Sequence, residues 1–180
     1  MAVTKTIMDS RELDLALARI ALQLLERNSD TEHLALVGIH TGGVYLAERL
    51  QRLLQQSSGV DVPVASLDIT LYRDDWSLIS QNPIVKRTEI TFSVEKMTLV
   101  LVDDVLYTGR TIRAALDAVM DFGRPRAIQL AVLVDRGGRE LPVQPDFKGI
   151  DVTVGENEHV NVLFAEADGE DGVVLVREQG

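Results

Sequence analysis

The sequence predicts an α/β domain in which helices flank a central, mostly parallel sheet. Short apolar runs, of the kind that form strands buried on both faces, alternate along the chain with segments of helical periodicity. The links between these segments are short, so strand, helix and strand form βαβ units. A length of 180 residues suits one domain, and we expect residues 1–180 to form a single one.

The first half of the chain begins with a predicted amphipathic helix at residues 10–27. Asp9 and Glu12 have the spacing of a capping box, and leucines then recur at helical intervals. A buried strand, a helix and an extended segment are predicted next, at residues 34–39, 44–55 and 62–72. Residues 73–96 alternate polar and apolar side chains around an Asn-Pro pair, which predicts a long, mobile hairpin or arm.

The second half of the chain repeats the order strand, helix, strand. These elements are predicted at residues 97–104, 111–122 and 127–135, and Gly123 ends the helix. The remaining sequence contains short extended stretches. We expect residues 136–180, together with part of the N-terminus, to form a small hood on the sheet.

The composition excludes several classes of protein. The chain has no cysteine, which excludes disulfides, thiolate nucleophiles and cysteine zinc sites. Its longest apolar runs fall short of the roughly 20 residues that cross a bilayer. Acidic residues occur too early in the chain for a secretory leader, so we expect a cytoplasmic protein without a membrane partner. The histidines lack metal-ligand spacing and predict no zinc site; they are His33, His40 and His159.

The net charge of −10 disfavours a nucleic-acid partner. Residues 141–180 carry nine acidic residues against Lys148 and Arg177. Such a surface repels a polyanion unless a local basic patch compensates for it.

The most informative stretch is LVLVDDVLYTGRT, at residues 99–111. Asp103 and Asp104 end an apolar strand, where their carboxylates can accept hydrogen bonds from sugar hydroxyls or bind Mg²⁺ directly or through water. Residues 108–111 precede a helix, whose free N–H groups and dipole favour a phosphate. Taken singly, the acids fit a solvated turn and TGRT fits a helix cap. Together they point to a ribose 5-phosphate.

The same stretch is similar to the phosphoribosyl pyrophosphate (PRPP) signature of type I phosphoribosyltransferases. Its flanks resemble the bifunctional pyrimidine operon attenuation regulator/uracil phosphoribosyltransferase family; they read LVGIHTGGVYLAERL, LDITLYRDD and RTIRAALDAVMDFGRPRAIQLAVLVDRG. The resemblance covers nearly the whole chain and weakens after about Gly149. It implies the type I phosphoribosyltransferase fold, conversion of uracil and PRPP to UMP and pyrophosphate with Mg²⁺, and a homo-oligomer that is at least a dimer.

The resemblance also implies roles for individual residues. Asp103 and Asp104 would hold the ribose hydroxyls and Mg²⁺, and residues 107–111 would hold the 5-phosphate. The implied PRPP stretch consists of Asp103, Asp104, Val105, Leu106, Tyr107, Thr108, Gly109, Arg110 and Thr111. Purine-specific relatives commonly carry an acid at the position of Tyr107, so its presence here favours a pyrimidine acceptor.

Further implied site residues lie outside that stretch. Thr41 and Gly42 would belong to a pyrophosphate loop, where glycine tolerates an unusual backbone conformation. A basic residue of the arm, Lys86 or Arg87, would reach the pyrophosphate. Arg136 would act in catalysis on the base and pyrophosphate side, and Val160 would lie in the hood.

Each of these assignments has a structural alternative. HTGG also suits a plain strand-to-helix turn, and Lys86 beside Arg87 also suits a solvated arm. Asp135 and Arg136 also suit an ion pair, and Val160 also suits the core.

The family's RNA-binding role is the main departure. Many relatives bind an mRNA attenuator through a basic face, but several basic positions are replaced here; the replacements are Leu22, His40, Gly42, Gly138 and Glu156. Arg19, Arg27 and Arg139 remain. The sequence therefore predicts feeble RNA binding. The other functions considered are a UMP- or UTP-sensing regulator with little turnover and a phosphoribosyltransferase for another base.

Overall fold

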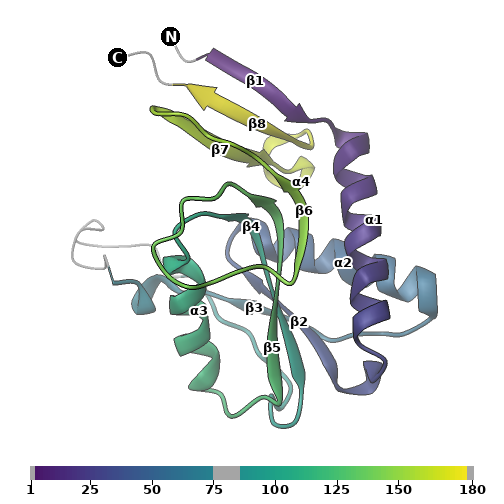
Figure 1. The fold of residues 1–180 in the computed structure, drawn as a ribbon. Coiled ribbons are helices and arrows are strands. Elements are labelled where there is room, and N and C mark those ends of the chain that lie inside the picture. Colours follow the sequence, from purple (N-terminus) through teal and green to yellow (C-terminus); the bar gives the residue numbers. More distant parts are fainter. Residues whose placement is uncertain (1–2, 75–85, 178–180) are drawn as a thin grey trace.

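The computed structural model describes residues 3–74 and 86–177, which hold two sheets (Figure 1). The main sheet has the strand order β3-β2-β4-β5-β6, and every neighbouring pair in it is parallel. Its strands are β2 (Leu34–Ile39), β3 (Val64–Leu67), β4 (Thr98–Leu106), β5 (Ala127–Asp135) and β6 (Phe147–Asp151). This arrangement confirms the predicted fold class.

Helices cover both faces of the main sheet, because successive strand residues point to opposite sides. Leu36 and Val100 pack in one core cluster with residues of α1 (Ser10–Arg27) and α2 (Gly42–Ser58). Their neighbours Val37 and Leu101 pack in a second cluster with α3 (Arg110–Met120) on the other face. Continuous apolar runs were therefore the correct signal for strands buried on both sides.

Several predicted boundaries are confirmed closely. Helix α1 spans residues 10–27, and both hydrogen bonds of its capping box form, from Glu12 N to Asp9 Oδ1 and from Asp9 N to Glu12 Oε2. Strands β2 and β5 match the prediction. Helix α2 begins two residues earlier than predicted and β4 continues to Leu106, so the ligand loops are shorter than expected.

The second sheet is small and antiparallel, with the order β1-β8-β7. Its strands are β1 (Val3–Met8), β7 (Glu158–Leu163) and β8 (Gly172–Arg177), and the short helix α4 (Ala165–Asp168) joins the last two. Figure 1 shows this sheet beyond the end of the main sheet at which β4 and β5 finish. Strand β6 falls in the predicted hood range but pairs with β5, because buried Phe147 and Gly149 fit the main sheet.

The region between β3 and β4 departs from the prediction. The predicted extended segment 62–72 contains only the four residues of β3, followed by a 3-10 turn, η2 (Thr70–Tyr72). Residues 75–85, at the centre of the predicted mobile hairpin or arm, lie outside the described residues. In residues 86–96 the described pairing is an antiparallel bridge between Glu89 and Ser66, without a named strand.

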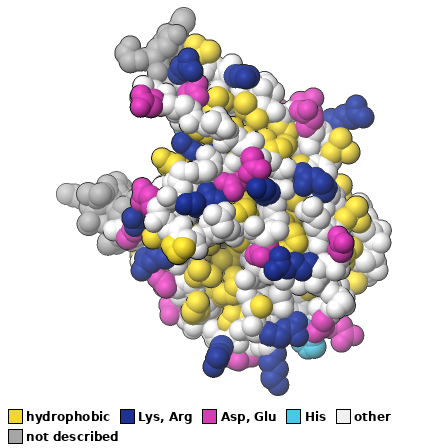
Figure 2. Space-filling model, viewed as in Figure 1, with side chains coloured by type: hydrophobic (Ala, Val, Ile, Leu, Met, Phe, Trp, Pro, Cys, Tyr) yellow, Lys and Arg dark blue, Asp and Glu magenta, His cyan; other side chains and the backbone are white. Residues whose placement is uncertain are grey.

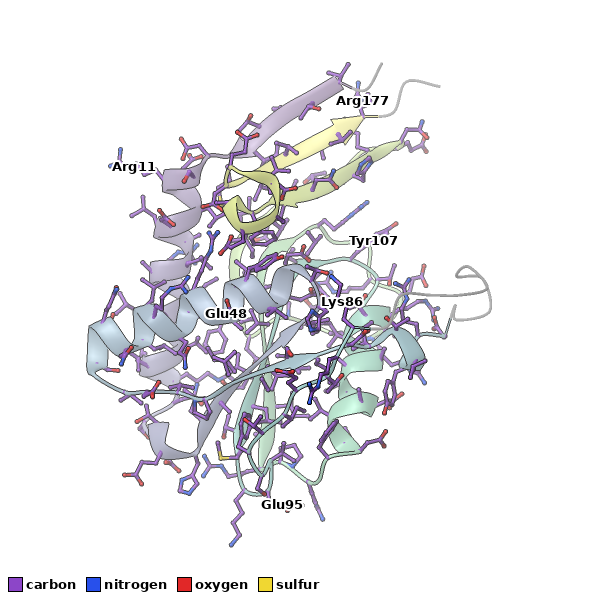
Figure 3. All side chains as sticks on the ribbon, turned by 180° about the vertical axis from the view of Figure 1, so that it is seen from behind. Arg11, Glu48, Lys86, Glu95, Tyr107 and Arg177 are labelled. Carbon is purple, nitrogen blue, oxygen red and sulfur yellow. The ribbon has the colours of Figure 1, made fainter. Side chains whose placement is uncertain are left out.

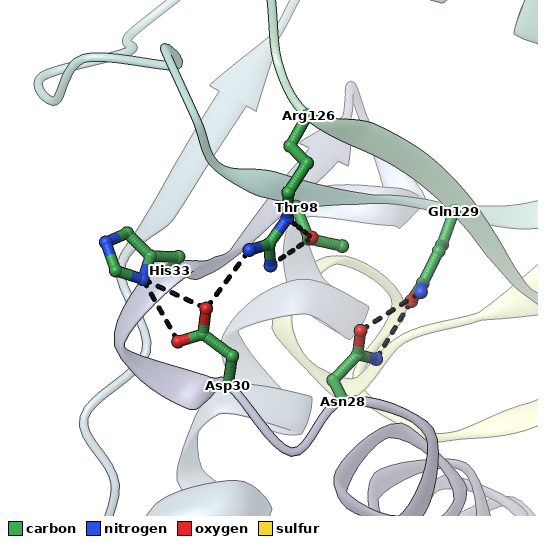
Figure 4. A network of polar contacts seen from close by, with 6 residues as sticks. All are labelled: Asn28, Asp30, His33, Thr98, Arg126 and Gln129. Atoms are coloured by element: carbon green, nitrogen blue, oxygen red, sulfur yellow. Dashed lines mark hydrogen bonds and ion pairs between the residues drawn. The ribbon is translucent and has the colours of Figure 1, made fainter.

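A network of hydrogen bonds connects the residues around the amino ends of β2, β4 and β5 (Figure 4). Arg126 donates hydrogen bonds to Thr98 Oγ1 and to Asp30 Oδ2, and Asp30 also contacts His33, which lies in the 3-10 turn η1 (Thr31–His33). Hydrogen bonds from the His33 and Arg126 side chains lower the pKa of Asp30. Asn28 and Gln129 join the end of α1 to β5 through reciprocal amide hydrogen bonds. The opposite end of the sheet is left for ligand loops.

Among the described residues, no helix is long and apolar enough to cross a membrane.

Candidate functional site

The candidate site lies where the parallel strands β2, β4 and β5 end. The register pairs Gly38 of β2 with Val102 of β4, and Val105 of β4 with Val134 of β5. The loops that follow these strands therefore meet at one edge, where α/β sheets bind ligands. Figure 3 shows Lys86 and Tyr107 toward this end of the sheet and Glu95 at the other.

The acid pair stands at the end of β4 in two different environments. Asp103 is only 7% exposed, and its Oδ1 accepts a hydrogen bond from Asp104 N at 3.0 Å. Burial, and then the neighbouring charge of Asp104, raise the pKa of Asp103 well above its usual range. Asp104 is half-buried, and its Oδ1 accepts from Val105 N at 2.8 Å. Carboxyl groups whose pKa is raised by burial and by a neighbouring charge occur often at functional sites.

Asp104 also touches the start of α2. A Cβ added to Gly42 would lie 2.5 Å from Asp104 Oδ2 and 2.9 Å from the Phe164 ring, so space requires glycine here. The unusual backbone conformation expected in this loop is present, but it does not lie at Gly42, which belongs to α2 and has no positive φ. The unusual peptide is instead the cis bond between His40 and Thr41.

The loop before α3 has the form of an anion site. Gly109, the N-cap residue of α3, has φ +92° and no side chain that could cap the helix. Apart from Arg110 N, which donates to Thr108 Oγ1, the N–H groups of the first helical turn remain available, and the helix dipole favours negative charge beside them. A cavity of about 400 Å³ opens here; its lining includes Arg73, Asp74, Asp103, Val105, Leu106 and residues 107–112.

The side chain of Arg110 pairs with two carboxylates of the protein and is not free to bind an anion. Its Nε donates to Glu140 Oε2 at 2.7 Å, and its Nη1 donates to Asp74. The Arg110 guanidinium is therefore paired within the protein, and its backbone N–H is directed into the loop. Thr108 Oγ1 accepts from that N–H at 3.3 Å.

The structure brings Lys86 to the loop after β2. Its Nζ donates to Thr41 Oγ1 at 2.6 Å. Arg87 is 86% exposed and pairs with Glu89 at 3.4 Å, so the geometry favours Lys86 as the basic residue of the site. Asp68, at 9% exposure, fixes the backbone of Lys86 by accepting its N–H, and its Oδ1 also accepts from Thr70 N.

The importance of Asp68 was missed in the sequence. It directly follows the apolar end of β3 in the stretch LDIT, as Asp103 follows an apolar run in β4. A lone acid after a strand is a weaker signal than an adjacent pair, since most such acids are exposed turn residues.

Arg136 follows β5 and stacks on Tyr107. Its Cζ lies 3.8 Å from the Tyr107 ring centroid, and its buried Nε has no hydrogen-bond partner among the described residues. The alternative of an ion pair with Asp135 was wrong, because Asp135 Oδ2 accepts from Arg139 Nη2 at 2.7 Å. Burial opposes the charge of Asp135, but hydrogen bonds from Arg139 and Gly137 N outweigh it and lower the pKa.

Arg136 lines a different cavity from the anion loop. This second cavity of about 430 Å³ is lined by residues 135–137, Arg139, Gln144 and residues 151–154. Val160, in β7, is partly buried and packs against the core cluster of α1 and α2.

The acid pair fits Mg²⁺ only if a ligand supplies further oxygens. No group of three or more His, Cys, Asp or Glu side chains among the described residues could hold a metal alone. Mg²⁺ is commonly held by one or two carboxylates together with substrate phosphates and water. Asp103 and Asp104, beside a cavity with an anion loop, match that donor set.

Comparisons with known proteins place these features in a wider context. A family model described as "Phosphoribosyl transferase domain" matches residues 3–168. The chain is 55% identical over 174 residues to "Bifunctional protein PyrR" of Thermus aquaticus, covering 97% of this chain and 96% of that protein. It is 51% identical over 172 residues to the protein of that name from Syntrophobacter fumaroxidans, covering 96% and 92%.

Solved structures share the fold at low sequence identity. An HGPRT-ase from Leishmania tarentolae, solved in complex with GMP, matches with a TM-score of 0.71 and 20% identity over 98% of this chain and 97% of that one. The hypoxanthine phosphoribosyltransferase of Trypanosoma cruzi matches with a TM-score of 0.72 and 18% identity over 97% of each chain.

Proposed function

Because this chain belongs to the phosphoribosyltransferase domain family and, within it, to the bifunctional PyrR proteins, we propose that it is a uracil phosphoribosyltransferase. The reaction joins N1 of uracil to the anomeric carbon of PRPP, with loss of the N1 proton, and releases pyrophosphate to give UMP. The observation that carries the proposal is the cavity that Asp103 lines together with the N-terminus of α3, with Asp104 next to Asp103.

The ribose 5-phosphate part of PRPP has a chemical counterpart in this cavity. Asp103 and Asp104 accept hydrogen bonds from the two ribose hydroxyls, and residues 107–111 donate backbone N–H groups to the phosphate. A cationic ligand or hydroxyl donors beside Asp103 would also offset the cost of its burial, which raises its pKa. Val105 and Leu106, which end β4, connect the acid pair to the loop that would hold the phosphate.

The pyrophosphate would be held by the loop after β2. Lys86 Nζ and Thr41 Oγ1, which contact each other at 2.6 Å, are the donors that face it. Negative charge grows on this group as its bond to the ribose breaks, and fixed donors stabilise that charge more than they stabilise the bound substrate. Gly42 leaves the space through which Asp104 and this loop approach.

Uracil would lie on the side of Arg136 and β7. Arg136 stacks on Tyr107, and its buried Nε, which has no partner among the described residues, would donate to an acceptor on the ligand. Val160 would contribute backbone groups of the hood. An uncharged Tyr107, where purine-specific relatives commonly have an acid, suits a pyrimidine.

Mg²⁺ would be held by Asp103 and Asp104, directly or through water, together with oxygens of PRPP. When bound it neutralises charge on the departing pyrophosphate.

Turnover with a charge-removing variant tests the proposal. The protein is incubated with uracil, PRPP and Mg²⁺, and UMP and pyrophosphate are measured. The unmodified protein should form both products in equal amounts. Replacing Asp103 and Asp104 together by Asn keeps the shape of both side chains but removes their charge, and should abolish formation of both products while the fold persists. Equal turnover by the double variant would show that the acid pair has no role.

A second candidate is a regulator that senses UMP or UTP with little turnover. Identity of 51–55% to proteins named bifunctional, over nearly the full length, favours it. Tight UMP binding without product formation would support this candidate over the enzyme. We further propose a homo-oligomer of at least two chains, which sedimentation would detect.

A further inference from the structure

The segment that follows β5 lies against the anion loop through backbone hydrogen bonds. Arg136 N donates to Leu106 O at 3.0 Å. Glu140 N and Leu141 N both donate to Thr108 O, at 2.9 and 3.1 Å. The carbonyl groups of Leu106 and Thr108 are thereby turned toward this segment.

The carbonyl between them is held by a side chain. Arg139 Nη1 donates to Tyr107 O at 3.0 Å. The guanidinium is itself fixed, because Nε donates to Val143 O at 2.7 Å and Nη2 to Asp135 Oδ2 at 2.7 Å. Its side chain is 14% exposed, and Asp135 is more deeply buried still. Because its guanidinium donates to three different oxygens, Arg139 has little freedom to bind another partner.

The direction of these carbonyls matters for anion binding. A loop binds a phosphate through N–H groups that point into the cavity, whereas a carbonyl oxygen turned the same way would repel it. Residues 106–108 turn their carbonyls toward residues 136–141, so the N–H groups after Gly109 can face the cavity. Gly109 supports this arrangement sterically, because a Cβ there would lie 3.3 Å from Val143 and 3.4 Å from Leu141.

The loop itself supplies one side-chain restraint, the long hydrogen bond from Arg110 N to Thr108 Oγ1 at 3.3 Å, and it does not hold a carbonyl group. The N-cap residue Gly109 has no side chain, and the Arg110 side chain pairs with Glu140 and Asp74. The direction in which the carbonyl and N–H groups of the anion loop point thus depends on the segment after β5.

We propose that Arg139 is a positioning residue for the anion loop: by holding the Tyr107 carbonyl away from the cavity, it keeps the following N–H groups directed at the 5-phosphate of the ligand. The inference rests on the proposed function for the identity of the ligand. It also removes Arg139 from the basic residues that remain for RNA.

Binding of UMP to three variants tests the inference. Arg139→Gln removes the charge and the fork, and Arg139→Lys keeps the charge but can reach fewer of the three oxygens. Arg124→Gln is the matched control, since Arg124 is exposed at the opposite end of the sheet. Calorimetry gives the dissociation constant of UMP, and amide hydrogen exchange reports on residues 106–112 separately from the main sheet.

UMP affinity should fall about tenfold in Arg139→Gln, the factor that corresponds to one hydrogen bond of ordinary strength, and less in Arg139→Lys. Exchange should speed up at residues 106–112 while the main sheet and the Arg124→Gln variant stay unchanged. Unchanged UMP affinity in both Arg139 variants would overturn the inference. Faster exchange throughout the sheet would also overturn it, because it would indicate a general structural role.

The two proposals can fail separately. If the unmodified protein does not bind UMP, the proposed function fails, and the exchange measurement still tests whether Arg139 holds the loop. If Arg139→Gln does not fold, Arg139→Lys decides the matter by the same two measurements.

Discussion

The carboxylate of Asp104 lies in the space beside Gly42, so closely that a Cβ on Gly42 would come within 2.5 Å of Asp104 Oδ2. The contact joins the loop after β2 to the acid pair at the end of β4. These are the two places to which we assign the pyrophosphate and the ribose of PRPP. One methyl group at position 42 is therefore expected to disturb both.

Gly42→Ala should weaken PRPP binding. The added carbon must displace Asp104 or the Phe164 ring, and overpacking of this kind costs about 1–3 kcal/mol. Calorimetry with PRPP and Mg²⁺ and thermal unfolding measure the two consequences. Gly155→Ala is the control, because its added carbon meets only the flexible Glu158 side chain. PRPP affinity equal to that of the unmodified protein would argue against the Asp104 assignment.

Lys86 and Arg87 offer an internal comparison. Lys86→Gln should raise the KM for PRPP about tenfold, because a charge-assisted contact to the pyrophosphate and to Thr41 is lost. Arg87→Gln should change it little, since Arg87 is 86% exposed and paired with Glu89. Steady-state kinetics at varied PRPP would reveal the opposite order if Arg87 were the residue that reaches the ligand.

The sequence predicted the frame of this protein better than its details. Buried strands such as Leu34–Ile39 were recognisable because both faces of the main sheet are covered, which makes the whole run apolar. Helix α1 was recognisable to the residue because its capping box is local. Strand β1 could not be placed as readily, since most of its residues are exposed and its pairing with β8 joins opposite ends of the chain.

In the candidate site, too, local features were predicted from the sequence and contacts between distant segments were not. The stretch from Asp103 to Thr111 is continuous in the sequence, so its acids and its anion loop were predicted together, and Asp103 and the loop line one cavity. The reason for Gly42, the stacking of Arg136 on Tyr107 and the role of Arg139 all depend on contacts between distant segments. No local pattern encodes such contacts.

Asp103→Asn should make the free protein more stable at neutral pH. Burial and Asp104 raise the folded-state pKa of Asp103, so its contribution to stability is fully present below the ordinary value of 3.8 and is lost as the pH rises through the raised value. Asn cannot ionise and escapes that loss, while its side-chain oxygen can still accept from Asp104 N.

The gain should be about 1 kcal/mol or more and should shrink toward acid pH. Urea unfolding at a series of pH values measures it, with the exposed Asp14→Asn as control. A variant that is less stable than the unmodified protein at every pH would contradict the proposed cost of burying this acid.

RNA binding should be feeble at physiological salt. Arg19 Nη1 donates to Lys148 O at 3.0 Å, Arg27 pairs with Asp146 at 3.0 Å, and Arg139 Nη1 donates to Tyr107 O at 3.0 Å. Figure 2 shows Lys and Arg side chains interspersed with Asp and Glu over the visible face. In single strands the logarithm of affinity falls by about 0.7 per phosphate contact for each logarithmic unit of salt, and few contacts are available here.

A mobility-shift titration with the leader of a pyrimidine operon, with and without UMP, measures this directly. Weak binding that UMP does not stimulate is the expected result. Nanomolar binding that UMP strengthens would show that a basic face forms despite these internal contacts, for instance across an oligomer.

The most direct test of the account is a competition among bases for PRPP. Uracil, orotate, adenine, guanine and hypoxanthine are supplied together with PRPP and Mg²⁺, and the nucleotides formed are separated and quantified. We predict UMP as the dominant product, with pyrophosphate released in equal amount. A purine nucleotide as the main product would contradict the assignment of uracil as the acceptor, and PRPP consumption without any nucleotide would contradict the transferase itself.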